Sequence, residues 1–550
     1  MLKKSINILF VVWYLLSANT TLAYTHADTL RGSNGRYRDW WDVQRYELGV
    51  NFDLDNQSIN GYTIIDFRVT KKPADSMQID LQEHMEIDSV FQRYGGVKTL
   101  QPINFRRDGN VCWVYFERFP FHNWLPTEMR SIKIYYHGTP RKAVNPPWDG
   151  GFSWKTDNEG KQWVAVSCQG LGASVWWPCK DAQWDEPEQG MDIYLTVPEN
   201  YSAISNGRLK DTVKVNSKKV FYWQLKNPIN NYDVTFYIGD YVHWQDTLTG
   251  EKGKLDLDYW VLRDNEEKAR KQFAVVKPML HCYEYWLGPY PFYEDGYKLV
   301  EAPYLGMEHQ SAIAYGNKYQ MGYLGSDRSN TSVGMHFDYI IVHESGHEWF
   351  GNSITAKDIA DNWIHEGMTT FSESLFTECL LGKEKGQTFC KGEWGNIRND
   401  KPVTGDYGVN NEGSNDIYDK GAAMMYMIRM LMNDDEKFRQ MLRGVSKTFY
   451  HQTVTTQQIE SYIAKATGLD LTAFFNQYLR TTNIPQLAYY IKDGELNYRF
   501  ENIVPGFTLP IPVSVKKKTE IISPTADWQH IEWKHGYNLK VSPDYLIKVK

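Results

Sequence analysis

The sequence predicts a multidomain α+β protein, with a β domain first, a mainly helical domain second and a small β domain last. Three observations support this prediction. The chain has 550 residues, more than one hydrophobic core usually holds, which indicates roughly two to four domains. Strand-type alternation fills the first part, and apolar residues at helical spacing dominate the middle. Alternation returns near the end, so the predicted domains are 24–245, 246–482 and 483–550.

The chain begins with a segment typical of an export signal peptide. Lys3 and Lys4 precede an apolar run from Ile8 to Leu16, and small and polar residues then lead to Ala23. This run is too short to span a bilayer comfortably, which favours cleavage after Ala23 over a retained membrane anchor. We therefore expect an exported protein, periplasmic or secreted, with no membrane association after cleavage.

The composition excludes several classes of partner and site. The net charge is −7 and there is no long basic run, so neither nucleic acid nor an anionic membrane surface is an expected partner. Six cysteines occur without a CxxC pair, which argues against a cysteine-rich zinc module. We expect most of them to be small buried residues, although an oxidising compartment would allow some to pair.

The first domain is predicted to be a large all-β unit. Its strand-like stretches are separated by turn-forming pairs such as Asn-Gly, Asp-Gly and Asp-Asn. They include YELGVNFDL, GYTIIDFRV, VCWVYFERF, SIKIYYHG and MDIYLTV.

The second domain is predicted to be mainly helical because its apolar residues recur at helical spacing. Its helices are predicted over NEEKARKQFAVVKPMLHCYEYWLG, DYIIVHESGHEWFGN, IHEGMTTFSESLFTECLLG, GAAMMYMIRMLM and LDLTAFFNQYL. The second of these is expected to end at Gly351 and Asn352, which suit a C-cap. A strand-like stretch, KLVEAPYLGMEHQSAIAYG, separates the first two. The chain beyond is strand-like again, and about seventy residues suffice for a small β-sandwich.

One helix carries a pattern with the spacing of a metal site. His343 and His347 are one helical turn apart, so both imidazoles can reach one ion at about 2.0–2.1 Å. Glu344 lies about 100° round the helix, which excludes it as an equivalent ligand. It can flank the open coordination position where a water would bind, which is the place of a general base.

Two further glutamates complete the predicted site. A catalytic zinc keeps three protein ligands and one open position, and Glu366, eighteen residues beyond His347, is the natural third ligand. Glu373, seven residues later, lies on nearly the same helical face as Glu366. Its carboxylate could accept a hydrogen bond from the free ring N–H of a ligating histidine. A bare HExxH match often has no function, but here a spaced third ligand accompanies it. The sequence therefore predicts one Zn²⁺ per chain. Gly346 within the helix suggests close packing of another element, or plain tolerance of glycine.

HExxH followed by eighteen residues and Glu-Gly resembles the aminopeptidase N family of zinc metallopeptidases, the gluzincin aminopeptidases that include leukotriene hydrolase. HEWFGN and EG stand in this sequence as the family has them. The resemblance covers nearly the whole chain after residue 23. It implies a saddle-like β domain, a thermolysin-like catalytic domain and a β-sandwich.

A second stretch, LGMEHQ, is similar to the family's Gly-x-Met-Glu-Asn strand along the cleft. By this resemblance Gly306, Met307 and Glu308 bind substrate, and Glu308 receives its free α-amino group. A desolvated ammonium needs a partner charge. His309 stands where the family usually has Asn.

Two more stretches match in the right order. IYDKGAAMMYMI resembles the family's Tyr-x-Lys-Gly, which implies that Tyr418 stabilises the oxyanion. SCQGLGASVWWPCKD resembles the stretch that leads to Pro-Cys-x-Asp, which implies that Gln169 contacts the substrate's N-terminal residue. The alternative for Gln169 is a turn residue between strands.

The function that these motifs imply is a zinc aminopeptidase acting on peptides with a free N-terminus. A thermolysin-like endopeptidase would share the zinc ligands and Glu344 but would need no amine anchor. An inactive peptide-binding protein on the same architecture would be expected to have lost a ligand or Glu344. Epoxide hydrolysis at the same site is a lesser alternative.

Overall fold

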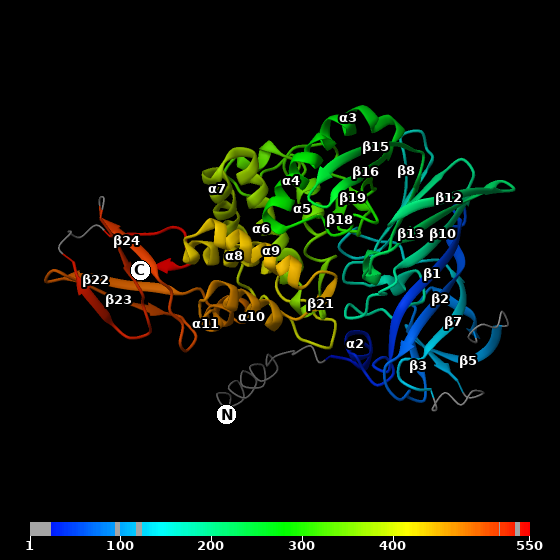
Figure 1. The fold of residues 1–550 in the computed structure, drawn as a ribbon, viewed down its shortest axis with the longest axis horizontal. Helices are drawn as coiled ribbons and strands as arrows, with labels where there is room; N and C mark the ends of the chain where they lie inside the picture. The colour runs from blue at the N-terminus through cyan, green and yellow to red at the C-terminus, as the bar shows by residue number, and fades with distance from the viewer. Residues whose placement is uncertain (1–23, 94–99, 117–123, 516–517, 534–538) are drawn as a thin grey trace, which may run out of the picture.

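In the computed structural model, three parts follow one another along the molecule (Figure 1). The small C-terminal sheets lie at one end, the N-terminal β domain at the other, and the helices between them. The structure describes all residues except 1–23, 94–99, 117–123, 516–517 and 534–538. The predicted signal peptide lies outside the described residues. Among the helices that are described, none has the length and apolarity needed to traverse a bilayer.

The N-terminal domain is built on two sheets and is preceded by α2 (His26–Gly32). The larger sheet has the order β12-β13-β10-β1-β2-β7-β4-β5-β6-β3 and the smaller one β11-β14-β9-β8. The strands of the larger sheet are β1 (Trp41–Asp53), β2 (Ser58–Val69), β3 (Met77–Asp80), β4 (Met85–Arg93), β5 (Leu100–Asp108), β6 (Val111–Tyr115), β7 (Met129–Gly138), β10 (Met191–Pro198), β12 (Arg208–Val215) and β13 (Lys218–Leu225). Those of the smaller sheet are β8 (Gly151–Thr156), β9 (Gln162–Ser167), β11 (Ser202–Ser205) and β14 (Phe236–Gly239).

The middle domain begins with a five-stranded sheet of order β15-β16-β17-β19-β18. Its strands are β15 (Tyr241–Gly250), β16 (Gly253–Leu262), β17 (Tyr297–Glu301), β18 (Gly306–Met307) and β19 (Ile313–Tyr315). The boundary predicted between residues 245 and 246 lies inside β15. The short strand β18 lies at the edge of this sheet, with β19 as its neighbour.

Nine helices of the described chain complete the middle domain. They are α3 (Glu266–Gln272), α4 (Val276–Leu287), α5 (Tyr339–Gly346), α6 (Trp363–Leu381), α7 (Lys383–Glu393), α8 (Asp419–Met432), α9 (Asp435–Thr448), α10 (Thr456–Thr467) and α11 (Thr472–Arg480). Two short strands, β20 (Ile354–Ala356) and β21 (Gln452–Val454), pair in parallel between them.

Two helix predictions differ from the structure. The first predicted helix is divided into α3 and α4 by a 3₁₀ turn at Phe273–Val275, because Pro278 has no N–H for a continuous helix. The helix α5 ends at Gly346, five residues before the predicted C-cap at Gly351. His347 still has helical backbone angles, φ −63° and ψ −20°, so the one-turn spacing of the two histidines survives the early end.

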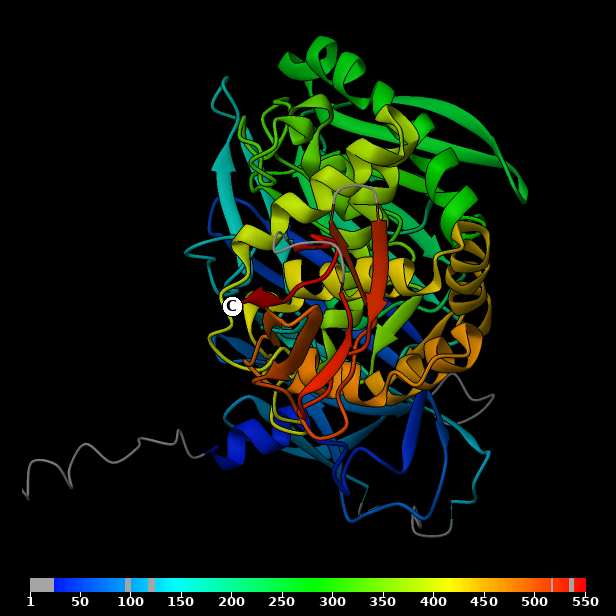
Figure 2. The ribbon, with the colours of Figure 1, turned by 90° about the vertical axis from the view of Figure 1, so that its left-hand side faces the viewer.

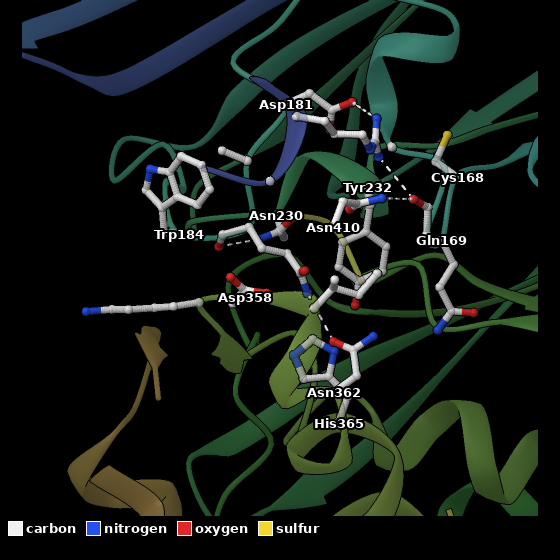
Figure 3. A pocket seen from close by; sticks show the side chains of 18 residues that line it. Cys168, Gln169, Asp181, Trp184, Asn230, Tyr232, Asp358, Asn362, His365 and Asn410 are labelled. Carbon is white, nitrogen blue, oxygen red and sulfur yellow. Dashed lines mark hydrogen bonds and ion pairs between the residues drawn. The ribbon is translucent and has the colours of Figure 1, made fainter. Parts of the chain in front are cut away.

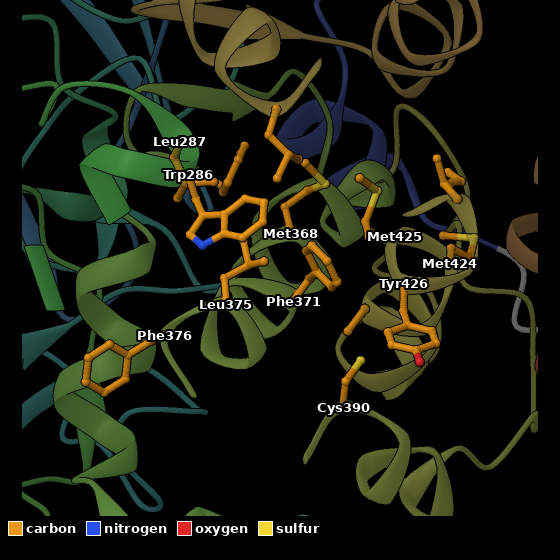
Figure 4. Packing of buried hydrophobic residues seen from close by; sticks show 14 of the residues in the cluster. Trp286, Leu287, Met368, Phe371, Leu375, Phe376, Cys390, Met424, Met425 and Tyr426 are labelled. Carbon is orange, nitrogen blue, oxygen red and sulfur yellow. The ribbon is translucent and has the colours of Figure 1, made fainter. Parts of the chain in front are cut away.

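The core of the middle domain surrounds α6 (Figure 4). Trp286 of α4, Phe371 and Leu375 of α6 and Met425 of α8 are all buried in it. A disulfide joins Cys282 of α4 to Cys379 of α6. The remaining cysteines are buried and unpaired, as expected for most of them: Cys112, Cys168, Cys179 and Cys390.

Glycines allow α6 to approach its neighbours closely. A Cβ at Gly346 would lie 2.8 Å from Oγ of Ser372, which confirms the close packing suggested by this glycine. A Cβ at Gly367 would lie 2.8 Å from Cα of Gly421, so α6 and α8 touch backbone to backbone. Any larger side chain at Gly367 or Gly421 would push α6 and α8 apart.

The C-terminal part consists of two small sheets, which face the viewer in Figure 2. Their orders are β26-β23-β22-β28 and β25-β24-β27. The strands are β22 (Gln486–Lys492), β23 (Glu495–Glu501), β24 (Ile511–Val515), β25 (Lys518–Ile522), β26 (Gln529–Glu532), β27 (Lys540–Val541) and β28 (Lys548–Val549). The predicted fold class is therefore confirmed: a β domain, a mainly helical domain and small C-terminal sheets.

Candidate functional site

The helices α5 and α6 bring the three predicted metal ligands together. Nε2 of His343 and Nε2 of His347 are 3.2 Å apart. Oε2 of Glu366, in the first turn of α6, lies 3.5 Å from the first of these atoms and 3.3 Å from the second. All three side chains are buried, so the donor atoms form one compact cluster within the protein.

The hydrogen bonds of the two imidazoles fix which nitrogens face the cluster. Nδ1 of His343 lies 2.6 Å from Oε1 of Glu373, and Nδ1 of His347 lies 2.9 Å from the carbonyl oxygen of Phe350. A carboxylate and a carbonyl only accept hydrogen bonds here, so both Nδ1 atoms carry the proton. Both Nε2 atoms then face each other and Glu366. Although burial opposes the shift, Glu366 raises the pKa of His347 to about 9, so the cluster favours a positive charge at this point.

This donor set fits a cation. Oε2 of Glu366 is buried and has no hydrogen-bond partner among the described residues. Two imidazole lone pairs and a carboxylate oxygen at these distances repel one another unless a positive charge, a proton or a metal ion, lies between them. Two nitrogens and one oxygen are the ligands of a catalytic zinc with an open fourth position. The site is therefore a candidate zinc site formed by His343, His347 and Glu366.

Glu344 lies between the cluster and the edge strand β18. A Cβ at Gly306 would be 2.5 Å from Oε1 of Glu344, so a side chain at this position would displace the carboxylate from its place in the cleft. Burial raises the pKa of Glu344 to about 8, although His343 and His347 oppose the shift. A cation held by the ligands would lower that pKa and favour the carboxylate.

A second group of side chains lies beside the metal ligands. Nε2 of Gln169 donates to Oε1 of Glu308 and to Oε1 of Glu366, each at 3.0 Å. The hydroxyl of Tyr232 also donates to Oε1 of Glu308, at 3.2 Å. The N-terminal β domain thus contributes Gln169 and Tyr232 to a site whose other residues belong to the middle domain.

The motifs did not reveal Tyr232, because one tyrosine among 37 gives no signal without its spatial neighbours. Gln169, Tyr232 and His365 also line a small cavity of about 50 Å³ between the two domains (Figure 3). Burial lowers the pKa of His365 to about 3, and its Nε2 accepts a hydrogen bond from the backbone N–H of Ala356 at 2.7 Å. The imidazole of His365 therefore binds the backbone at Ala356 and is not part of the metal cluster.

Tyr418 stands directly before α8 with its ring 6.0 Å from the ring of His343. Burial raises its pKa well above the ordinary tyrosine value, and Glu366 adds to the shift. The hydroxyl is therefore protonated at neutral pH and can donate a hydrogen bond. A cleft of about 430 Å³ contains the predicted residues Gln169, Gly306, Met307, Glu308, His343, Glu344, His347, Glu366 and Tyr418.

His309 points away from this cleft. Its Nδ1 lies 2.7 Å from the hydroxyl of Tyr237, and burial lowers its pKa to about 3. The backbone carbonyl of Glu308 accepts a hydrogen bond from Asn352 at 2.8 Å. The histidine that replaces the family's usual Asn is thus a neutral core residue, and it does not line the metal cleft.

Comparison with family models and known proteins agrees with this site. The Peptidase family M1 domain matches residues 272–478, and the Peptidase M1 N-terminal domain matches residues 43–232. Leukotriene A-4 hydrolase of Xenopus laevis is 25% identical over 346 residues, 58% of this chain and 53% of that protein. Aminopeptidase N of Lactobacillus helveticus is 23% identical over 498 residues, 84% of this chain and 53% of that protein.

The chain spans about half the length of these curated relatives. Among solved structures, a mutant M1 zinc metallopeptidase of Deinococcus radiodurans bound to a Tyr-Ser-Ala substrate superposes with a TM-score of 0.65. The alignment covers 82% of this chain and 96% of that one at 19% identity, a level that establishes the shared fold. The two family models, the metal cluster and this fold agree. The chain belongs to the M1 peptidase family, the zinc gluzincins that include the aminopeptidase N and leukotriene A4 hydrolase types.

Proposed function

We propose that the protein is a zinc-dependent aminopeptidase that releases N-terminal residues from peptides. The observation that supports this most strongly is the position of Glu308. Gln169 joins Glu308 to the metal ligand Glu366 through one amide nitrogen, so the anchor for an ammonium group lies next to the metal. When the α-amino group of a substrate is held there, the carbonyl group of its first residue is the one that reaches the metal.

The residues of the chain have separable roles in this reaction. His343, His347 and Glu366 would hold the zinc, which when bound acts as a Lewis acid toward the scissile carbonyl and acidifies water. Glu344 accepts a proton from the attacking water and passes it to the leaving amine. The Tyr418 hydroxyl donates to the oxygen that becomes negative. Glu308, held by Gln169 and Tyr232, pairs with the substrate ammonium.

The proposal is tested with aminoacyl-p-nitroanilides that carry either a free or an acetylated amine. We expect cleavage of the free-amine compounds only, and loss of that cleavage on addition of a zinc chelator. Acetylation removes the ammonium charge that Glu308 requires. Cleavage of internal bonds in blocked peptides would instead identify a thermolysin-like endopeptidase, and zinc binding without any cleavage would favour a peptide-binding protein.

Tyr418→Phe is expected to lower kcat by about 10²–10³ with little change in KM, because an oxyanion donor acts mainly in the transition state. Steady-state kinetics on a free-amine p-nitroanilide measures both constants. Tyr323→Phe is the matched control, since Tyr323 lines the same cleft; it should keep most of the turnover. An unchanged kcat in Tyr418→Phe would remove Tyr418 from the mechanism.

We further propose that the protein is exported, to a periplasm or to the medium. Two features support this. Residues 1–23 have the charge and hydropathy pattern of a cleaved signal peptide. Cys282 and Cys379 form a disulfide, and disulfides persist mainly in oxidising compartments.

A further inference from the structure

We propose that a second cavity beside the metal cleft binds an apolar or aromatic side chain of the substrate, at its third or fourth residue. The inference rests on the proposed aminopeptidase function and defines the class of peptide that the site prefers. Its parts are the edge strand β18, the direction in which a peptide must lie along it, and the lining of the cavity.

The strand β18 can accept a further strand. It is the last strand of its sheet and pairs with β19 through Gly306 and Met307. The free edge of such a strand presents unpaired N–H and C=O groups, and extended peptides commonly bind to them. Both residues of β18 line the metal cleft, so a peptide on this edge lies beside the metal ligands.

The amine anchor fixes the direction of that peptide. Glu308 follows β18 directly, so a peptide whose N-terminus is held there runs from Glu308 past Gly306 toward Leu305. It is therefore antiparallel to β18. An extended chain advances about 3.3–3.4 Å per residue. Counted from Glu308, residue 2 therefore lies near Met307, residue 3 near Gly306 and residue 4 near Leu305, where β18 gives way to a bend.

A cavity of about 490 Å³ begins at that point. It shares Leu305 and Trp148 with the metal cleft, and so adjoins it. Tyr304, Tyr319 and Leu324 are among its apolar walls, and Asn265, Lys268, Glu301 and Lys318 also line it. Trp148 and Leu324 both line this cavity and are 55% and 41% exposed. Their apolar surface is therefore available to a ligand.

The apolar and aromatic part of this lining indicates the chemical class of the occupant. An aromatic ring in the cavity would cover apolar surface of Trp148 and Leu324 and would remove its own surface from water. The direction of the peptide leaves its third and fourth residues as the ones that reach this surface. Dipeptides and p-nitroanilides end before it.

The test compares three pentapeptides with the same first residue: Leu-Gly-Gly-Gly-Gly, Leu-Gly-Phe-Gly-Gly and Leu-Gly-Gly-Phe-Gly. The readout is kcat/KM for release of leucine, expressed as the ratio of each Phe peptide to the all-glycine peptide. Because side chains alternate along an extended peptide, one of the two Phe peptides should be cleaved about tenfold faster, as burial of part of a phenyl ring predicts.

Trp148→Ala and Leu324→Ala should each bring that ratio down toward one. The ratio is taken within each variant, so partial misfolding does not change it. Val144→Ala is the matched control: it lies in the same segment as Trp148, is 86% exposed and lines neither cavity, and it should keep the full ratio. A ratio near one in the unaltered enzyme, or a ratio that persists in both variants, would overturn the subsite. Failure to release leucine from any peptide would overturn the proposed function as well.

Discussion

Glu344→Gln is expected to lower kcat by about 10²–10⁴, the usual contribution of general acid–base catalysis, while the protein keeps its zinc. Glutamine has the shape of glutamate but cannot accept the proton of the attacking water. Glu344 is not one of the three predicted ligands, although its carboxylate also lies close to His347 and Glu308. Its replacement by glutamine therefore leaves His343, His347 and Glu366 in place. The measurement is kcat on a free-amine p-nitroanilide together with the zinc content of the purified variant.

Glu348→Gln provides the matched control. Glu348 is four residues further along and is also buried, but it accepts hydrogen bonds from Tyr290 at 2.9 Å and from the backbone N–H of Ser311 at 2.8 Å. It does not line the cleft, and its isosteric replacement should keep most of the turnover. A Glu344→Gln variant that lost both zinc and turnover would leave the assignment of the base unsupported.

Glu366→Ala is expected to abolish stoichiometric zinc binding and to reduce peptide hydrolysis to the background rate. The change removes one of three protein ligands and leaves two imidazoles that no longer form a catalytic zinc site. Because zinc binds the folded chain, its loss also lowers stability, by about 4 kcal/mol at a free zinc concentration 1,000 times Kd. Zinc content and the thermal midpoint, each with and without added zinc, measure both effects.

Glu373→Gln is the graded comparison for that experiment. Its carboxylate holds Nδ1 of His343 at 2.6 Å, and the loss of such a supporting partner typically weakens metal binding by about 10–100-fold. This variant should therefore recover full occupancy and activity when zinc is raised, whereas Glu366→Ala should not. One zinc per chain in Glu366→Ala would remove Glu366 from the set of ligands.

The part of the site that the sequence predicts by physical reasoning is the local part. His343 and His347 must share a helical face at a spacing of four, and that relation needs only one helical turn. The two histidines share that face although α5 ends five residues before the predicted C-cap, because His347 keeps helical backbone angles. At the end of this helix Gly346 packs closely against Ser372 of α6, a tertiary contact that local spacing does not reveal.

The amine end of the site is non-local and could not be derived from spacing. Gln169 and Glu308 are 139 positions apart, and only the resemblance to a family placed them together. Tyr232 belongs to no matched motif, so its bond to Glu308 appears only in the folded molecule. The cavity beside β18 likewise joins Trp148 of the N-terminal part to Leu305 and Leu324 of the middle domain.

The contact of Gly367 with Gly421 has a consequence for how the site can respond to its substrate. Gly367 follows the predicted metal ligand Glu366, and Gly421 lies in the first turn of α8, three residues after Tyr418. The separation of ligand and tyrosine is therefore set by two main chains in direct contact, which no rotamer change can widen. We therefore expect this side of the site to change little between substrates, and we expect adaptation to different peptides at β18 and the N-terminal domain instead.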